Sequence, residues 1–315
     1  MARVYLAITI DVEPDCTLTW HYSSPLKFEG VSVGIKKLLQ PLFDKYQISP
    51  TYLINNVVLE NADSVEIFKN LSGSFELGTH LHPEFIEPEK TVFQYAGSKG
   101  EANCCFYSED IEFEKIKNIT TLFEKQFGYK PLSFRAGRFS AGANTMTSLE
   151  SLGYKVDTSV TPHMRWADKT REKPVDYTNH PEQPYWYNKN ILEVPVSIIR
   201  KSRFSIKEIL KSGFGIRRKP QLHKNLWLRP VYSNVKEFGE ILKHTINSNQ
   251  TSESIVLNMM FHNVEVMPGL SPYCKNETDC ANYLKDLESF FIFCKEYKVE
   301  SIKLSDLYDV YQKKN

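Results

Sequence analysis

Short apolar runs rich in β-branched and aromatic residues alternate with longer amphipathic stretches over most of this chain. This alternation predicts strands joined by helices, because side chains repeat every two residues in a strand and about every 3.6 in a helix. Strands are expected at 3–10, 50–54, 74–78, 132–135, 155–159, 191–198, 254–261 and 300–304. Helices are expected at 33–46, 62–70, 108–127, 144–152, 279–296 and 305–311.

Strands joined by helical crossovers form a parallel sheet, and 315 residues suit a closed (β/α) barrel. An open doubly wound sheet is the alternative. No glycine-rich phosphate loop follows the first strand, which disfavours a nucleotide-binding domain. With 41% hydrophobic and 24% charged residues the chain can bury a large core, and we expect residues 1–315 to form a single domain.

Two stretches interrupt the alternation and are expected to be loop insertions, at about 161–190 and 200–232. The first holds Trp166 among proline, asparagine and charged residues. The second contains ten lysines and arginines between 200 and 229 and one acid, Glu208. This excess favours contact with a phosphate-bearing ligand or an anionic membrane surface, or it marks a solvated loop with partners elsewhere.

The overall charge is nearly balanced, with 39 Lys and Arg against 38 Asp and Glu, which argues against a general nucleic-acid-binding protein. No apolar run reaches the roughly 20 residues that a membrane helix needs, and the N-terminus lacks a signal-peptide pattern. The six cysteines show no paired Cys-x-x-Cys spacing, so we expect reduced thiols and a cytoplasmic location.

Acidic and imidazole side chains follow two of the predicted strands. Asp11, Glu13 and Asp15 come directly after the first strand, and three acids so close together repel one another unless a cation lies between them. His80 and His82 follow the strand at 74–78. Two imidazoles and one carboxylate can hold a divalent ion such as zinc and leave a coordination position open.

Later strands also end in charged residues. Arg135 and Arg138 lie at and just after the end of the strand at 132–135, where they are expected to orient a carboxylate or bind substrate. His262 follows the strand at 254–261 with Glu265 nearby, and is a candidate general acid. Because parallel strands end at one rim, these groups predict metal-assisted hydrolysis of an amide or ester.

Five motifs occur in a fixed order along the chain. They are Thr9-Ile10-Asp11-Val12-Glu13, Gly78-Thr79-His80-Leu81-His82-Pro83, Phe134-Arg135-Ala136-Gly137-Arg138-Phe139, Asp157-Thr158-Ser159-Val160, and Phe261-His262-Asn263 leading to Pro268-Gly269-Leu270-Ser271-Pro272-Tyr273. This series resembles the polysaccharide deacetylases of the NodB-homology type, carbohydrate esterase family 4. The His-x-His-Pro form is similar to the WalW-like branch, which is linked to lipopolysaccharide biosynthesis.

The resemblance implies a distorted (β/α)7–8 barrel and a role for each matching residue. Asp11 would be the catalytic base and Glu13 the metal-binding acid. His80 would be the first metal histidine, Arg135 would orient the base, and His262 would be the general acid.

The resemblance also has implications for three further positions, one in the oxyanion hole and two at which this sequence departs from the usual motifs. Phe139 falls where the family uses an aromatic residue's backbone N–H for the oxyanion. Val12 replaces the second of two adjacent aspartates, so the metal ligand shifts to Glu13 or, less favourably, to Asp15. Glu84 stands where the second histidine is usual, so either His82 or Glu84 completes the site, and we favour His82.

The sequence therefore predicts a cytoplasmic, zinc-dependent hydrolase that removes an N-acetyl or other acyl group from a sugar used in surface-polysaccharide assembly. Arg138, Phe139, Trp166 and Glu265 are expected to contact the substrate, with 185–187 stacking on its rings. The basic stretch at 200–229 would suit a nucleotide-linked or lipid-diphosphate-linked sugar, and neutralising Arg217 and Arg218 would test this. The rival interpretations are a metal-dependent sugar isomerase or epimerase and a catalytically inactive carbohydrate-binding relative.

Overall fold

The structure is a computed structural model that describes residues 2–91, 101–166, 174–202 and 223–313. Its central sheet has the strand order β12-β1-β2-β3-β4-β5-β9-β8, and β13 pairs with β1 beside this path. All neighbours are parallel except β8 and β9. The strands are β1 (Arg3–Val12), β2 (Thr51–Asn55), β3 (Glu76–Leu81), β4 (Ser133–Ala136), β5 (Val156–Asp157), β8 (Tyr185–Trp186), β9 (Leu192–Glu193), β12 (Ser254–His262) and β13 (Glu300–Ser301).

The sheet curls, and an irregular segment after β9 links its two ends. The Val196 amide donates to the Val160 carbonyl, on the β5 side. The next amide, that of Ser197, donates to the carbonyl of Asn258 on β12, and the Ser197 hydroxyl accepts from the Asn258 amide. The prediction of a distorted (β/α) barrel is therefore confirmed.

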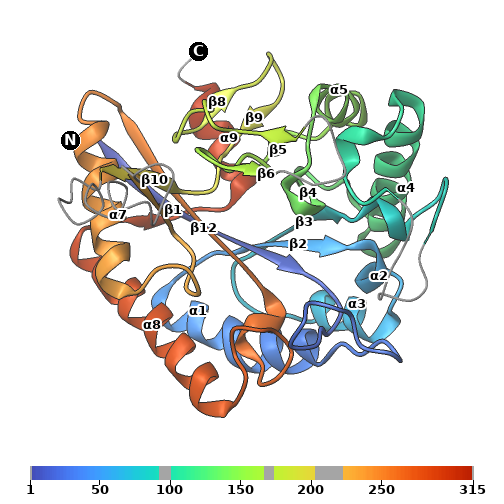
Figure 1. The fold of residues 1–315 in the computed structure, drawn as a ribbon, viewed down its shortest axis with the longest axis horizontal. Helices are drawn as coiled ribbons and strands as arrows, with labels where there is room; N and C mark the ends of the chain where they lie inside the picture. The colour runs from blue at the N-terminus through green and yellow to red at the C-terminus, as the bar shows by residue number, and fades with distance from the viewer. Residues whose placement is uncertain (1, 92–100, 167–173, 203–222, 314–315) are drawn as a thin grey trace, which may run out of the picture.

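Helices surround the sheet (Figure 1) and bury their apolar faces against it. Phe43, Ile116, Phe123 and Phe290 from three of these helices belong to one apolar cluster with residues of the inner strands. The longer helices are the π-helix η1 (Gly30–Leu39), α1 (Gln40–Tyr46), α3 (Ala62–Lys69), α4 (Glu109–Phe127), α5 (Ala143–Leu152), α7 (Val235–Ser248), α8 (Glu277–Glu296) and α9 (Leu304–Gln312). The short ones are α2 (Asn56–Leu59), η2 (Pro83–Phe85), η3 (Cys104–Phe106), η4 (Gly137–Phe139) and η5 (Asn263–Val266).

Several elements differ from the expectations. The expected helix at 33–46 is a π-helix followed by α1, and the expected strand at 191–198 is the two-residue β9 followed by an irregular segment. Helix α7 was not predicted, although its buried residues follow helical spacing and Asn234 caps its first turn.

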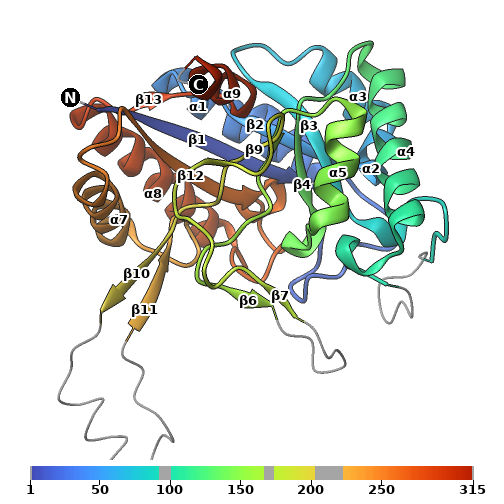
Figure 2. The same cartoon turned by 90° about the horizontal axis from the view of Figure 1, so that it is seen from above.

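The two expected insertions also contain regular structure. The first holds the short hairpin of β6 (Arg165–Trp166) and β7 (Val175–Asp176), as well as β8. The second is framed by the antiparallel pair of β10 (Ile198–Ser202) and β11 (His223–Trp227), which projects from the barrel in Figure 2. None of the helices in the described part of the chain combines the length and hydropathy needed to cross a bilayer.

Candidate metal and catalytic centre

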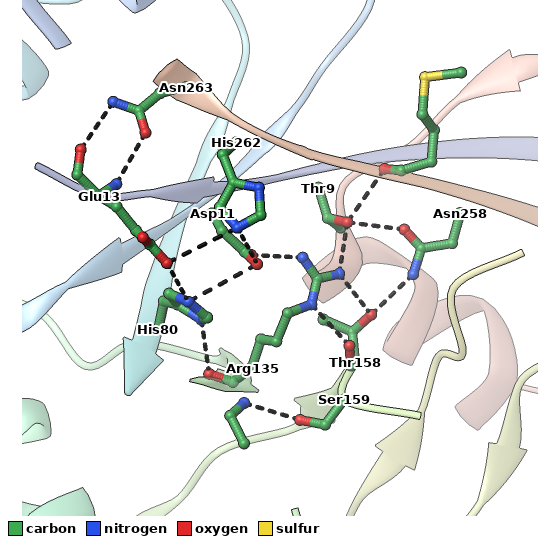
Figure 3. Close-up of polar contacts among 12 residues, drawn as sticks. Thr9, Asp11, Glu13, His80, Arg135, Thr158, Ser159, Asn258, His262 and Asn263 are labelled. Carbon is green, nitrogen blue, oxygen red and sulfur yellow. Dashed lines mark hydrogen bonds and ion pairs between the residues drawn. The ribbon is translucent and has the colours of Figure 1, made fainter. Parts of the chain in front are cut away.

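The polar residues singled out by the sequence meet at the carboxyl ends of four parallel strands (Figure 3). Asp11 on β1 and His262 on β12 are direct register partners, as are His80 on β3 and Arg135 on β4. Glu13 follows β1 by one residue. Sheet geometry therefore brings together side chains that are up to about 250 positions apart.

Glu13, His80 and His82 form a buried group that could hold a metal ion. Oε1 of Glu13 lies 3.1 Å from Nε2 of His80 and 2.9 Å from Nε2 of His82. The two imidazole nitrogens are 3.1 Å apart. Ligand atoms bound at about 2.1 Å around one zinc ion are separated by about 3 to 3.4 Å, so the three atoms fit such an ion.

The hydrogen bonding of His80 supports this fit. Its Nδ1 lies 3.1 Å from the carbonyl oxygen of Arg135, so Nδ1 carries the proton and Nε2 presents a lone pair. That lone pair faces the Glu13 carboxylate oxygen at 3.1 Å, and two acceptors cannot satisfy one another. A cation, either a shared proton or a metal ion, resolves the arrangement.

His82 is held from behind by Glu84 and Arg138. Glu84 Oε1 lies 2.7 Å from Arg138 Nη2 and 3.6 Å from His82 Nδ1, on the side away from Glu13. Burial opposes ionisation of Glu84, but His82 and Arg138 outweigh it and lower its pKa to about 2. Burial acts against protonated His82, but Glu13 raises the pKa of the imidazole to about 9. Of the two alternatives, His82 faces the candidate site and Glu84 orients it.

Glycine is needed where the next strand end approaches His82. A Cβ atom at Gly137 would lie 2.8 Å from the Leu81 carbonyl oxygen and 3.0 Å from the His82 ring. The following residues, Arg138 and Phe139, both have positive φ, 54° and 55°. Strained backbone of this kind is concentrated at functional sites, and here it shapes the turn that carries Phe139.

Glu13 is fixed by two residues that were not among the predicted site residues, Tyr22 and Asn263. Its Oε2 accepts a hydrogen bond from the Tyr22 hydroxyl at 2.9 Å. The Asn263 side chain bonds both the amide and the carbonyl of Glu13, as a neighbouring strand would. Burial acts to raise the pKa of Glu13, but His82 and His80 outweigh burial and hold it well below its usual range. The carboxylate is therefore ionised at neutral pH.

Asp11 is held by Arg135, whose guanidinium is fully buried. Arg135 Nη1 donates to Asp11 Oδ1 at 2.6 Å, Nη2 donates to Thr9 Oγ1, and Nε donates to the Thr158 carbonyl. Oδ2 of Asp11 is left facing His80 and His262. Burial works against the carboxylate, but Arg135 and the histidines lower the pKa of Asp11 below its usual value.

His262 completes the group on its exposed side. Its Nε2 lies 3.9 Å from both Asp11 Oδ2 and Glu13 Oε1, and 15% of its side chain is exposed. Its Nδ1 lies 2.8 Å from Glu265, and the Trp20 ring lies 4.9 Å from the imidazole. Glu265 was expected to contact substrate, but it is fully buried behind His262. We correct that expectation, because Glu265 can act only through His262.

The other expected contacts are divided between the site and other parts of the fold. Phe139 stacks on Trp166 at 5.7 Å, and its ring lies 5.8 Å from the Arg135 guanidinium, so both rings flank the site. Asp15 is no candidate ligand, because its carboxylate accepts the amides of Glu29 and Gly30. The expectation that Trp186 stacks on a substrate is wrong, since it packs on Tyr308 of α9.

Of the basic stretch at 200–229, the structure describes 200–202 and 223–229, and three basic residues there have partners within the protein. Lys201 and Lys224 pair with acids of α7, and Arg229 is buried against Glu265. The expectation that the basic stretch contacts an external anion therefore does not hold for Arg229, because the partner of this residue lies inside the protein. Arg217 and Arg218 lie outside the described residues.

Comparisons with known proteins place this geometry on a known fold. No protein-family model matches the chain, and no curated protein matches its sequence. A solved structure from Pseudomonas aeruginosa PAO1, described as a polysaccharide deacetylase, matches with a TM-score of 0.57 at 13% identity, covering 99% of this chain and 92% of that one. These proteins share a fold. A polysaccharide deacetylase from Mycobacterium smegmatis gives 0.56 at 15% identity (99% and 91% covered), and an allantoinase gives 0.56 at 14% (98% and 90%).

Proposed function

We propose that the protein is a metal-dependent hydrolase that removes an N-acetyl or other acyl group from a sugar in surface-polysaccharide or lipopolysaccharide biosynthesis. The observation that carries the proposal is the buried Glu13, His80 and His82 group within 4 Å of both Asp11 and His262. The likeness in fold to polysaccharide deacetylases agrees with it. The WalW-like motif form supports the lipopolysaccharide assignment.

Glu13, His80 and His82 would hold the ion, and zinc suits two imidazoles and a carboxylate. A bound divalent ion would polarise the acyl carbonyl and lower the pKa of water at the site. Asp11, ionised and fixed through Oδ1 by Arg135, offers Oδ2 to take the proton from that water.

His262 lies on the other side of this space and would give a proton from Nε2 to the leaving amine. The backbone N–H of Phe139, in its positive-φ turn, would stabilise the oxyanion. Arg138 and Trp166 are assigned to substrate contact, because the guanidinium is partly exposed and the indole lies beside Phe139.

We further propose where the substrate is found and what the basic stretch contacts. The substrate would be a precursor inside the cell, consistent with the expected cytoplasmic location. The stretch 200–229, apart from Arg229, would approach a phosphate-bearing carrier or a membrane surface. The test of this part is neutralisation of Arg217 and Arg218, which should weaken activity on a nucleotide-linked acetylated sugar more than on the free sugar.

The central experiment compares metal content and acetate release in wild type and His80→Ala. Wild type should contain about one divalent ion per chain and release acetate from one of a panel of N-acetylated sugars and nucleotide sugars. The variant should lose both. Metal without acetate release, but with sugar isomerisation or epimerisation, would support the rival enzyme class. Sugar binding without a stoichiometric metal would support the inactive relative and overturn the proposal.

A further inference from the structure

Arg229 is a buried cation for which the proposed chemistry has no direct use. It follows β11 by two residues, and only 6% of its side chain is exposed. Its guanidinium carbon lies 5.5, 5.1 and 5.6 Å from the ring centres of Trp227, Tyr232 and Tyr273. These three rings, which we call the aromatic cage, enclose the guanidinium. A lysine ammonium is compact and strongly hydrated, so it would fill the cage less well.

The partner of the caged cation is Glu265. Nη2 of Arg229 pairs with Oε1 of Glu265, whose side chain is fully buried. The same oxygen lies 2.8 Å from Nδ1 and 3.2 Å from the backbone N of His262. Its other oxygen accepts the Tyr283 hydroxyl at 3.1 Å. The carboxylate is thus held on three sides, and His262 is one of its donors.

The contacts determine which nitrogen of His262 carries its inner proton. Arg229 Nη2 also lies 3.2 Å from His262 Nδ1, but a guanidinium can only donate. The carboxylate oxygen at 2.8 Å requires a donor, so Nδ1 is protonated and donates to Glu265. Nε2 then faces Asp11 and Glu13, on the side of the candidate centre.

This arrangement depends on Glu265 remaining an acceptor. Burial without a partner would favour the neutral acid, which could donate to Nδ1 and reverse the tautomer. Burial acts to raise the pKa of Glu265, but Arg229 and His262 outweigh it, and the net direction is downward.

We propose that Arg229, held by the aromatic cage, is a positioning residue that keeps Glu265 as the acceptor for His262 Nδ1 and thereby directs Nε2 at the leaving group. The inference rests on the proposed hydrolase function, because it assigns a purpose to the orientation of His262. Arg229 touches no reacting atom in this scheme and acts only through Glu265.

The first test uses the dependence on leaving group. An amide needs a protonated leaving amine, whereas 4-nitrophenyl acetate releases a stable phenolate without an acid. For Arg229→Met, kcat on an N-acetylated glucosamine disaccharide should fall about 100-fold with little change in KM. Its kcat on 4-nitrophenyl acetate should change by less than about threefold. Arg229→Lys, which keeps the charge, should recover part of the loss.

A second readout does not depend on activity. In ¹⁵N-histidine-labelled wild type, with His262 assigned by loss of its signals in His262→Gln, Nδ1 should stay protonated, and the proton given to the leaving amine would be the second proton of the imidazolium, on Nε2. In Arg229→Met the tautomers should mix. Arg3→Met, which removes an exposed arginine at the start of β1, should match wild type in both assays. If Arg229→Met unfolds, Arg229→Gln, which removes the charge but keeps a hydrogen-bond donor for Glu265, serves in its place.

The outcomes separate the two proposals. Wild type that releases acetate from no acetylated sugar would contradict the proposed function. The NMR experiment would still test whether Arg229 controls the tautomer of His262. An unchanged His262 tautomer in a folded Arg229 variant would overturn the inference. Equal losses on amide and activated ester would also overturn it, because a merely structural role slows both reactions.

Discussion

Glu112 on α4 offers a test of how burial without a counter-charge acts in this fold. The side chain is buried, Oε1 accepts from the Thr145 hydroxyl, and Oε2 has no partner among the described residues. Burial raises the pKa of Glu112 from 4.5 to about 7, although the Thr145 hydrogen bond acts in the opposite direction. The difference between these pKa values corresponds to about 3 kcal/mol.

The sign follows from proton binding. The unfolded chain loses this proton near pH 4.5, whereas the folded protein keeps it to about pH 7. Raising the pH through this window therefore lowers the free energy of unfolding. Glu112→Gln cannot ionise, so its stability relative to wild type should increase by about 2 kcal/mol between pH 5.5 and pH 8.

Urea unfolding of both proteins at the two pH values measures this difference. Glu114→Gln is the matched control on the same helix, because that carboxylate is 45% exposed and pairs with Lys117. It should show no comparable change with pH. A constant difference between Glu112→Gln and wild type across this range would refute the reasoning, since it would mean that Glu112 ionises as readily in the fold as in the unfolded chain.

Three further predictions concern the site and its supports. Asp11→Asn should lower kcat for acetate release by at least about 100-fold while metal analysis shows the ion retained. Chelation should lower the Tm of wild type, and zinc should restore it, whereas His80→Ala should respond to neither treatment. Lys115→Met should lower the free energy of unfolding in urea by about 3 kcal/mol or more, because the Nζ of buried Lys115 donates to backbone carbonyls of the 83–88 segment that follows His82. An unchanged urea midpoint for Lys115→Met would contradict that role.

The positions of Asp11, Glu13, His80 and His262 were predictable because each follows a strand, and the ends of parallel strands meet at one rim. The barrel was predictable for the same reason, since apolar runs and amphipathic stretches alternate in the sequence. His82 could be favoured over Glu84 from motif form, but the position of Glu84 behind the ring depends on the folded structure.

Arg229 and Glu265 show what the sequence could not supply. They are 36 positions apart, and a local excess of basic residues carries no information about which one is buried. Glu265 similarly looked available to substrate because it follows a strand end, yet η5 turns it inward against Tyr283. The missed α7 is different, because its amphipathic pattern and its Asn234 cap were visible in the sequence.

The pairing of Asp11 with His262 has a consequence for how this scaffold can change. Both sit at matched positions of adjacent strands, so backbone hydrogen bonds set their separation at one strand spacing, about 4.8 Å. That ladder is formed by β1 and β12 alone, and the described parts of the loop at 161–190 and of the β10–β11 pair lie outside it. Exchange of these segments between homologues should therefore leave the proposed base and acid at the same separation, which makes the segments suitable places for engineering.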